Sequence, residues 1–77
     1  MKGGFALDIG SRIKEIRRTG LLSQTDFAKE LGVSFSTVNR WENNKAIPGY
    51  QALKKLKEFC DKTGQPFDLD DKLWEDS

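Results

Sequence analysis

The sequence contains no histidine, a single cysteine and no long apolar run. Without histidine it lacks the usual general base and the commonest metal ligand, which argues against triad hydrolysis and most zinc sites. Cys60 alone cannot form a disulfide within the chain, which favours a reducing compartment. No run approaches the roughly 18 apolar residues of a membrane span, and the first ten residues are too polar for a signal peptide. We therefore expect a soluble, cytoplasmic protein that is not an enzyme and holds no metal or cofactor.

The charge of the chain is nearly balanced but unevenly distributed. Its 77 residues, enough for one small domain, include 13 basic and 12 acidic side chains, so the net charge indicates no particular partner. Residues 1–45 carry eight basic against five acidic side chains, whereas residues 46–77 carry five against seven. The first part is therefore the one in which a surface for a polyanion is expected.

Apolar residues recur at helical spacing in four segments of the chain. The patterns predict helices over residues 10–19, 24–31, 35–43 and 50–62, with the loop before the last helix marked by turn formers and Pro48. We expect Gly20 to end the first helix in the left-handed conformation, and Leu21 and Leu22 to lead the chain back to the core. Ser23 is expected to cap the second helix.

The connection between the second and third helices is very short. Gly32 directly follows the second helix, and Val33 and Ser34 precede the third, which predicts a turn of about three residues between two short helices. Val33 can fill the angle between these helices, while Val38 and Trp41 form an apolar pair on the inner face of the third. The segment is therefore expected to form a helix-turn-helix.

Between Ile9 and Pro48 the order of core, turn, cap and charged residues follows one pattern. It reads Gly10-x-Arg12-Ile13-Lys14-x-Ile16-Arg17, Leu22-Ser23-Gln24-x-x-Phe27-Ala28-x-x-Leu31-Gly32-Val33-Ser34, Val38-x-x-Trp41-Glu42-Asn43, and Pro48. This pattern resembles the phage repressor and Cro type of helix-turn-helix family, also called the xenobiotic-response-element (XRE) type. The resemblance implies an all-α fold, a compact four- to five-helix bundle of the lambda-repressor-like DNA-binding type. It also implies that the third helix enters the major groove of DNA while the second crosses the backbone.

The resemblance assigns base contacts to the exposed face of the third helix. The positions that read bases in the family are occupied by Phe35, Ser36 and Arg40, with Asn39 close by. Arg40 could bind guanine through two parallel hydrogen bonds, Phe35 could contact a thymine methyl group and Asn39 could pair with adenine. The alternative is that this polar face is only solvated, although an exposed phenylalanine is then hard to explain.

The resemblance also assigns backbone contacts and one structural ion pair. Gln24, Asn43 and Lys45 match positions that bind phosphates, whereas Ser34 could bind a phosphate or cap the third helix. Arg17 and Glu42 match positions that form a salt bridge between the first helix and the end of the third. The remaining basic residues of the first helix, Arg12, Lys14 and Arg18, are interpreted as a solvated face and left out of the site.

We expect a loosely ordered arm over residues 1–8, the DNA-binding domain over 9–66 and an acidic tail over 67–77. The domain is expected to bind double-stranded DNA in a sequence-specific manner as a small transcriptional regulator, a repressor, with a homodimer on a two-fold operator as one arrangement. The alternative is an antitoxin or another protein-interaction module whose tail binds a protein partner. In the tail, Leu69 and Trp74 could contact such a partner or fold back over the last helix.

Overall fold

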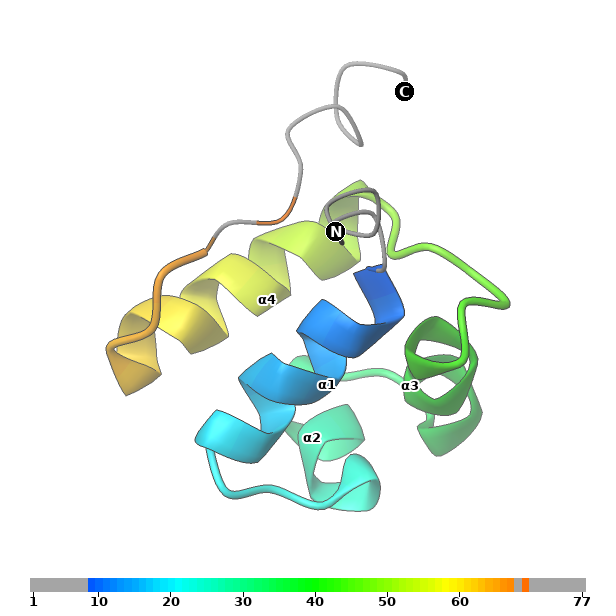
Figure 1. The fold of residues 1–77 in the computed structure, drawn as a ribbon, viewed down its shortest axis with the longest axis horizontal. Coiled ribbons are helices and arrows are strands. Elements are labelled where there is room, and N and C mark those ends of the chain that lie inside the picture. Colours follow the sequence, from blue (N-terminus) through cyan, green and yellow to red (C-terminus); the bar gives the residue numbers. More distant parts are fainter. Residues whose placement is uncertain (1–8, 68, 70–77) are drawn as a thin grey trace, which may run out of the picture.

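The computed structural model describes residues 9–67 and residue 69 of the chain. Four helices form in this part, as Figure 1 shows: α1 (Ile9–Thr19), α2 (Gln24–Leu31), α3 (Phe35–Glu42) and α4 (Tyr50–Thr63). The all-α prediction is confirmed, with four helices in the described range. Helices α1 and α3 pack against each other, and α2 packs against both α3 and α4. None of these helices is long and apolar enough to cross a membrane.

The capping serines begin the two helices of the helix-turn-helix. The Ser23 hydroxyl accepts a hydrogen bond from the backbone N–H of Asp26 at 3.0 Å, and the Ser34 hydroxyl accepts one from that of Thr37 at 3.1 Å. Both serines have extended backbone conformations, which is the geometry of an N-cap. Between the helices Gly32 is left-handed, with φ of 72°. Ser23 therefore caps α2 as predicted, and Ser34 caps α3, which is one of the two roles expected of it.

The turn after α1 differs from the prediction at two residues. Gly20 is not left-handed; the left-handed residue is Leu21, with φ of 62° and a side chain that is 91% exposed. A Cβ on Gly20 would lie only 2.5 Å from the ring of Phe59 on α4. Glycine is therefore required there because the chain passes so close to this ring. The predictions for Gly20 as a left-handed cap and for Leu21 as a core residue are wrong, whereas Leu22 packs against the core as predicted.

The core lies where the apolar faces of all four helices meet. Its aromatic centre is an edge-to-face pair between Phe27 of α2 and Phe59 of α4, with ring centroids 5.2 Å apart. Cys60 is completely buried and fills the core beside this pair. The other buried members of the cluster are Ile13, Ile16, Ala28, Leu31, Val38, Trp41, Leu53, Leu56 and Leu69.

Part of the predicted tail belongs to this core. Leu69 is buried, and Phe67 packs against the same cluster. The chain leading to them is held against α1, because the side-chain amide of Gln65 donates to the carbonyl of Ile16 at 3.1 Å. The fold-back alternative therefore describes Leu69, while Trp74 and the arm over residues 1–8 lie outside the described residues.

Candidate functional site

The outer face of α3 presents three side chains of different chemistry. Phe35 begins the helix and is 50% exposed. Ser36 and Arg40 are exposed on the same helix, one turn apart along it. This face therefore offers an apolar ring, a hydroxyl and a guanidinium at the surface, while Val38 and Trp41 hold the opposite face in the core.

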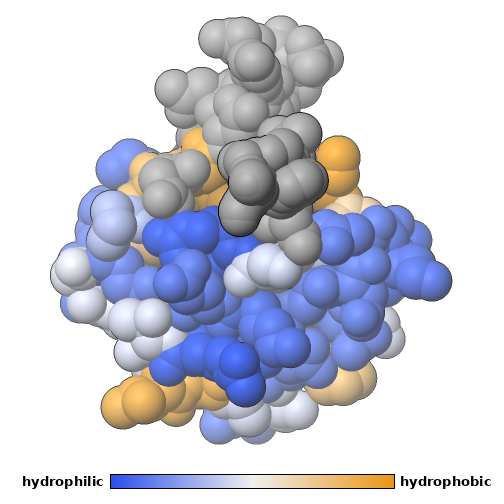
Figure 2. Space-filling view, viewed as in Figure 1, coloured by the Kyte–Doolittle hydropathy of each residue, from blue (hydrophilic) through white to orange (hydrophobic). Residues whose placement is uncertain are grey.

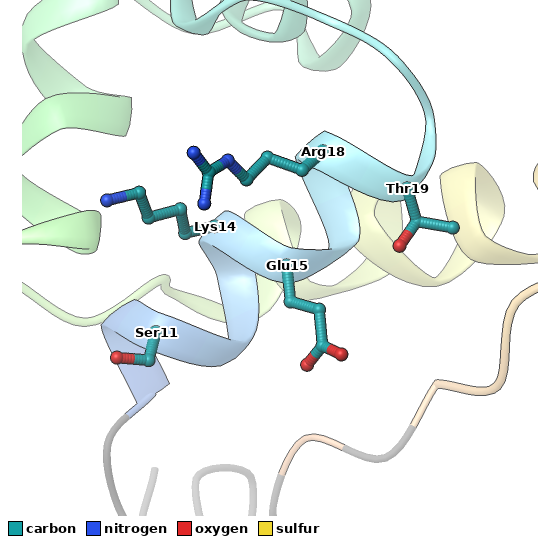
Figure 3. A pocket seen from close by; sticks show the side chains of 5 residues that line it. All are labelled: Ser11, Lys14, Glu15, Arg18 and Thr19. Carbon is teal, nitrogen blue, oxygen red and sulfur yellow. The ribbon is translucent and has the colours of Figure 1, made fainter.

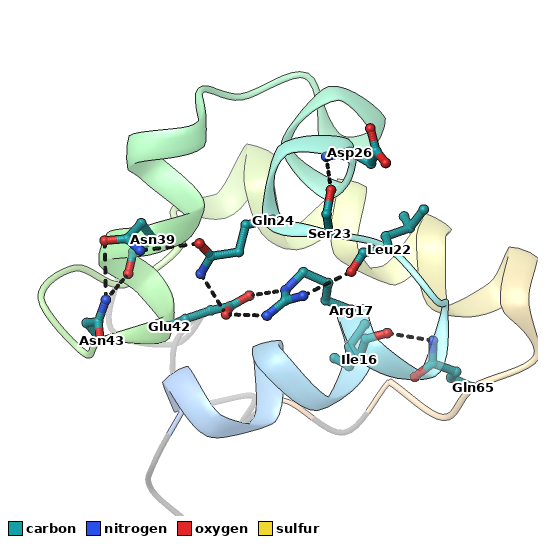
Figure 4. Close-up of polar contacts among 10 residues, drawn as sticks. All are labelled: Ile16, Arg17, Leu22, Ser23, Gln24, Asp26, Asn39, Glu42, Asn43 and Gln65. Atoms are coloured by element: carbon teal, nitrogen blue, oxygen red, sulfur yellow. Dashed lines mark hydrogen bonds and ion pairs between the residues drawn. The ribbon is translucent and has the colours of Figure 1, made fainter.

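All three nitrogens of the Arg17 guanidinium on α1 donate hydrogen bonds that hold it in place. Its Nε donates to Oε2 of Glu42 at 2.8 Å, and its Nη2 donates to Oε1 of the same carboxylate at 3.0 Å. The third nitrogen, Nη1, donates to the carbonyl of Leu22 at 2.9 Å. Figure 4 shows this arrangement, in which one arginine ties α1 both to the end of α3 and to the chain entering α2.

A chain of hydrogen bonds continues from this ion pair across α2 to α3. The amide nitrogen of Gln24 donates to Oε1 of Glu42 at 3.0 Å, and the amide oxygen of Gln24 accepts from Asn39 Nδ2 at 3.3 Å. Asn43 in turn donates to the backbone carbonyl of Asn39 at 2.8 Å and to its Oδ1 at 3.3 Å. These contacts, which Figure 4 draws as one continuous series, fix the orientation of α3 relative to α2 and α1.

The environment of Glu42 favours its charged form. Burial opposes ionisation, since the side chain is only 4% exposed, but the hydrogen bonds from Arg17 and Gln24 outweigh it. The positive charges of Arg17 and Lys14 act in the same direction, so the pKa of Glu42 lies below its ordinary value. The pKa of Arg17 is raised, mainly by the hydrogen bonds to Glu42. The pair is therefore fully ionised near neutral pH.

The predicted phosphate-binding residues differ in how far their side chains are already engaged. Lys45 is exposed after the end of α3, where Asn44 turns the chain with φ of 59°. Ser34, by contrast, uses its hydroxyl for the cap and for a 2.9 Å contact with the hydroxyl of Thr37. Of its two predicted roles, capping is therefore the one that the structure contains.

Sequence reasoning missed the side-chain role of Asn44. Its Oδ1 accepts a hydrogen bond from the backbone N–H of Gly10 at 3.0 Å, which ties the loop after α3 to the start of α1. In the sequence, Asn44 is only one of the turn formers in the loop before Pro48. No sequence signal pointed to the contact, because the two residues lie 34 positions apart.

Across residues 9–67 and 69, no cluster of three or more acidic, cysteine or histidine side chains could hold a metal ion. The polar side chains of Gln24, Asn39 and Asn43 are instead joined to one another by hydrogen bonds, and Arg40 and Lys45 are exposed nearby in the sequence.

A model of the family described as helix-turn-helix matches residues 13–67, which is most of the chain. The chain belongs to the helix-turn-helix family. No curated protein and no solved structure matches it. The helix-turn-helix itself is α2, the turn through Gly32 and α3, and membership confirms the resemblance to the XRE and Cro type. It implies that DNA is the partner of this domain, and members of this DNA-binding family are typically non-enzymatic.

Proposed function

We propose that this helix-turn-helix protein is a sequence-specific transcriptional regulator that inserts α3 into the major groove and represses by occupying its operator. The observation that supports this most directly is the hydrogen-bonded series from Arg17 to Asn43, because it holds α3 rigidly while leaving its outer face exposed. A reading helix needs this combination, since base contacts require donor and acceptor positions fixed to within a fraction of an ångström.

Three side chains are proposed to read bases. Arg40 presents a planar pair of donors suited to the O6 and N7 atoms of guanine, and Phe35 presents an apolar ring suited to a thymine methyl group. Ser36 can donate to or accept from several bases and adds less discrimination. Asn39, which the sequence grouped with them, is half-buried and already bonded to Gln24 and Asn43, so we assign it the role of positioning them.

Phosphate contacts are proposed at the edges of the same face. Gln24 uses one of its two amide hydrogens for Glu42, so the second can be donated to a phosphate oxygen. Asn43 and Lys45 follow α3 and are exposed, where the family resemblance expects the sugar-phosphate backbone. The amide nitrogen of Asn43 already donates to Asn39, so it would have to exchange one of these hydrogen bonds to bind a phosphate. Ser34 is proposed to contribute through the start of α3, whose first N–H groups favour an anion, rather than through its engaged hydroxyl.

The test is selection of bound sequences from a random duplex pool, combined with a salt titration of binding to the selected and to an unselected duplex. We expect enrichment of a defined site, and an affinity for both duplexes that falls steeply as salt rises. Two inverted half-sites about one helical turn apart would show that a homodimer binds, whereas a single half-site would show binding by a monomer. Binding without any enrichment would contradict sequence-specific recognition, and no binding at low salt would contradict the proposal altogether.

The antitoxin alternative rests on the acidic charge of the predicted tail and on its large apolar residues. Of these apolar residues, Phe67 and Leu69 pack on the protein's own core, while the acidic residues lie outside the described part of the chain. DNA binding by α3, by contrast, does not require Phe67 or Leu69 to leave the core. We therefore propose the regulator alone.

A further inference from the structure

Two basic side chains of α1 lie together on one side of the helix. Lys14 and Arg18 are four residues apart, which places them one above the other, and both are exposed. Figure 3 shows their charged ends directed to the same side, while the carboxylate of Glu15 points away from them. The three side chains, with Ser11 and Thr19, line a shallow hollow on the surface of α1.

The charge of this pair is not neutralised by the acidic residues of the helix. Glu15 forms its ion pair with Arg12, at 3.2 Å. In the part of the chain that the structure describes, no carboxylate forms an ion pair with Lys14 or Arg18. The adjacent Arg17 is matched by Glu42, so this side of α1 retains two unmatched positive charges.

The pair borders the surface proposed to contact DNA. Lys14 lies near enough to Glu42 to help stabilise its charged form, and Glu42 accepts a hydrogen bond from Gln24, a proposed phosphate ligand. Helices α1 and α3 are packed together, and Arg17, which lies between Lys14 and Arg18 in the sequence, is hydrogen-bonded to Glu42 at the end of α3. In the view of Figure 2 the surface over α1 and α3 is predominantly hydrophilic. A DNA backbone crossing the start of α2 would therefore meet these charges next.

We infer that Lys14 and Arg18 form a second phosphate-binding rim, which contacts the DNA backbone outside the segment that α3 reads. This inference rests on the proposed function and extends it. Each side chain neutralises a phosphate and releases counterions, which adds affinity on any sequence and no discrimination between sequences. Arg18 can bind two oxygens of one phosphate, whereas Lys14 acts as a point charge.

The experiment compares the salt dependence of binding for three proteins on the selected duplex and on a random one. The variant Lys14→Gln/Arg18→Gln removes the rim, and Lys54→Gln/Lys57→Gln removes the same charge from exposed positions of α4. If both rim residues bind phosphates, the slope of log K against log salt becomes shallower by about 1.8 in the rim variant. Between about 50 and 200 mM salt, that variant would then lose about tenfold less affinity than the wild type.

The outcomes of this experiment distinguish phosphate binding by Lys14 and Arg18 from a general effect of charge. Three results for the rim variant would together support phosphate binding by Lys14 and Arg18. Its affinity would be weakened equally on both duplexes, and its selected sequence would be unchanged. In an ethylation-interference assay, phosphates at the edge of the site whose ethylation blocks binding of the wild type would no longer do so. A slope and affinity matching those of the α4 control would overturn it while leaving the regulator intact. No DNA binding by the wild type would overturn both proposals. Lys14→Arg/Arg18→Lys, which keeps both charges, should restore most of the slope, and its failure to do so would also count against phosphate binding.

Discussion

The guanidinium of Arg17 and the carboxylate of Glu42 meet through two parallel hydrogen bonds, of 2.8 and 3.0 Å, although the two residues are 25 positions apart in the sequence. Both side chains are largely withdrawn from solvent, with exposures of 12% and 4%. A pair in this setting fixes an orientation, because either partner left alone would be a poorly solvated charge. Helix α3 is therefore held in place by a contact that uses none of the side chains proposed to read bases.

Replacing Arg17 with lysine should destabilise the protein although the charge is kept. Lysine cannot make the parallel pair of bonds to Glu42 and the third bond to the Leu22 carbonyl at the same time. We expect the free energy of unfolding to fall by about 1–3 kcal/mol, measured by urea denaturation. Arg18→Lys, an exposed change on the same helix, should stay within about 0.5 kcal/mol of the wild type. Equal stabilities for the two variants would show that the geometry of the pair is unimportant.

The ion pair should also give the protein an acid-sensitive stability. The pKa of Glu42 is lower in the folded state than its ordinary value of 4.5, so the folded state binds fewer protons at this site than the unfolded state. Its contribution is complete above about pH 4.5 and is lost as the pH falls through the lower, folded-state pKa. Unfolding of the wild type and of Glu42→Gln, followed from pH 3 to 7, should therefore show a stability difference that shrinks in acid. A difference that is constant over this range would contradict the assignment.

The helices and their caps could be predicted from the sequence because they depend on local features. The spacing of Ile13 and Ile16 and the serines before α2 and α3 act within one or two helical turns. The turn after α1 could not be predicted in the same way. Gly20 looks like an ordinary left-handed cap, but the ring that requires a glycine there belongs to Phe59, far along the chain. A local rule cannot detect a steric constraint imposed by a distant side chain.

The same limit applies to the candidate site. The family pattern identified Gln24, Asn39 and Asn43 individually, each as a polar residue near DNA. The Gln24–Asn39 hydrogen bond depends on how closely α2 approaches α3, which is set by the core and the short turn at Gly32. The bonds between Asn39 and Asn43, by contrast, join residues four positions apart at the end of α3. The sequence therefore predicted the candidate residues, whereas the hydrogen bond that joins Gln24 to Asn39 is seen only in the structure.

Two substitutions of Ser34 should distinguish its role in capping α3 from a role in phosphate binding. Ser34→Ala removes the acceptor for the Thr37 N–H and should lower the free energy of unfolding by about 1 kcal/mol, as seen by thermal or urea unfolding. Ser34→Asp keeps an acceptor and should retain the stability, but it adds a negative charge at the DNA surface and should weaken binding to every duplex. If Ser34→Asp bound DNA as well as the wild type, the start of α3 would not face the backbone.

Arg40 should control the preference for one DNA sequence over another rather than the affinity for DNA in general. If it binds guanine through two hydrogen bonds, Arg40→Ala should cost about 1–3 kcal/mol on the selected site and relax the choice at one base pair, as measured by anisotropy on single-substituted duplexes. Lys45→Ala is the matched comparison, because it removes the same charge from the exposed loop after α3. It should weaken all duplexes alike and reduce the salt slope by about one. Identical profiles for the two variants would remove Arg40 from the reading surface.

Asn39 is the residue at which the sequence pattern and the structure suggest different roles, and a double-mutant cycle can decide between them. As a positioning residue, Asn39 acts through Gln24, so Asn39→Ala should weaken binding to selected and random duplexes equally, by about 0.5–1.5 kcal/mol, with the selected sequence unchanged. In a Gln24→Ala background the same substitution should have little further effect, because the two changes interrupt one series of contacts. Additive effects, together with relaxed choice at a single adenine position, would instead place the Asn39 amide on a base edge and return it to the reading surface.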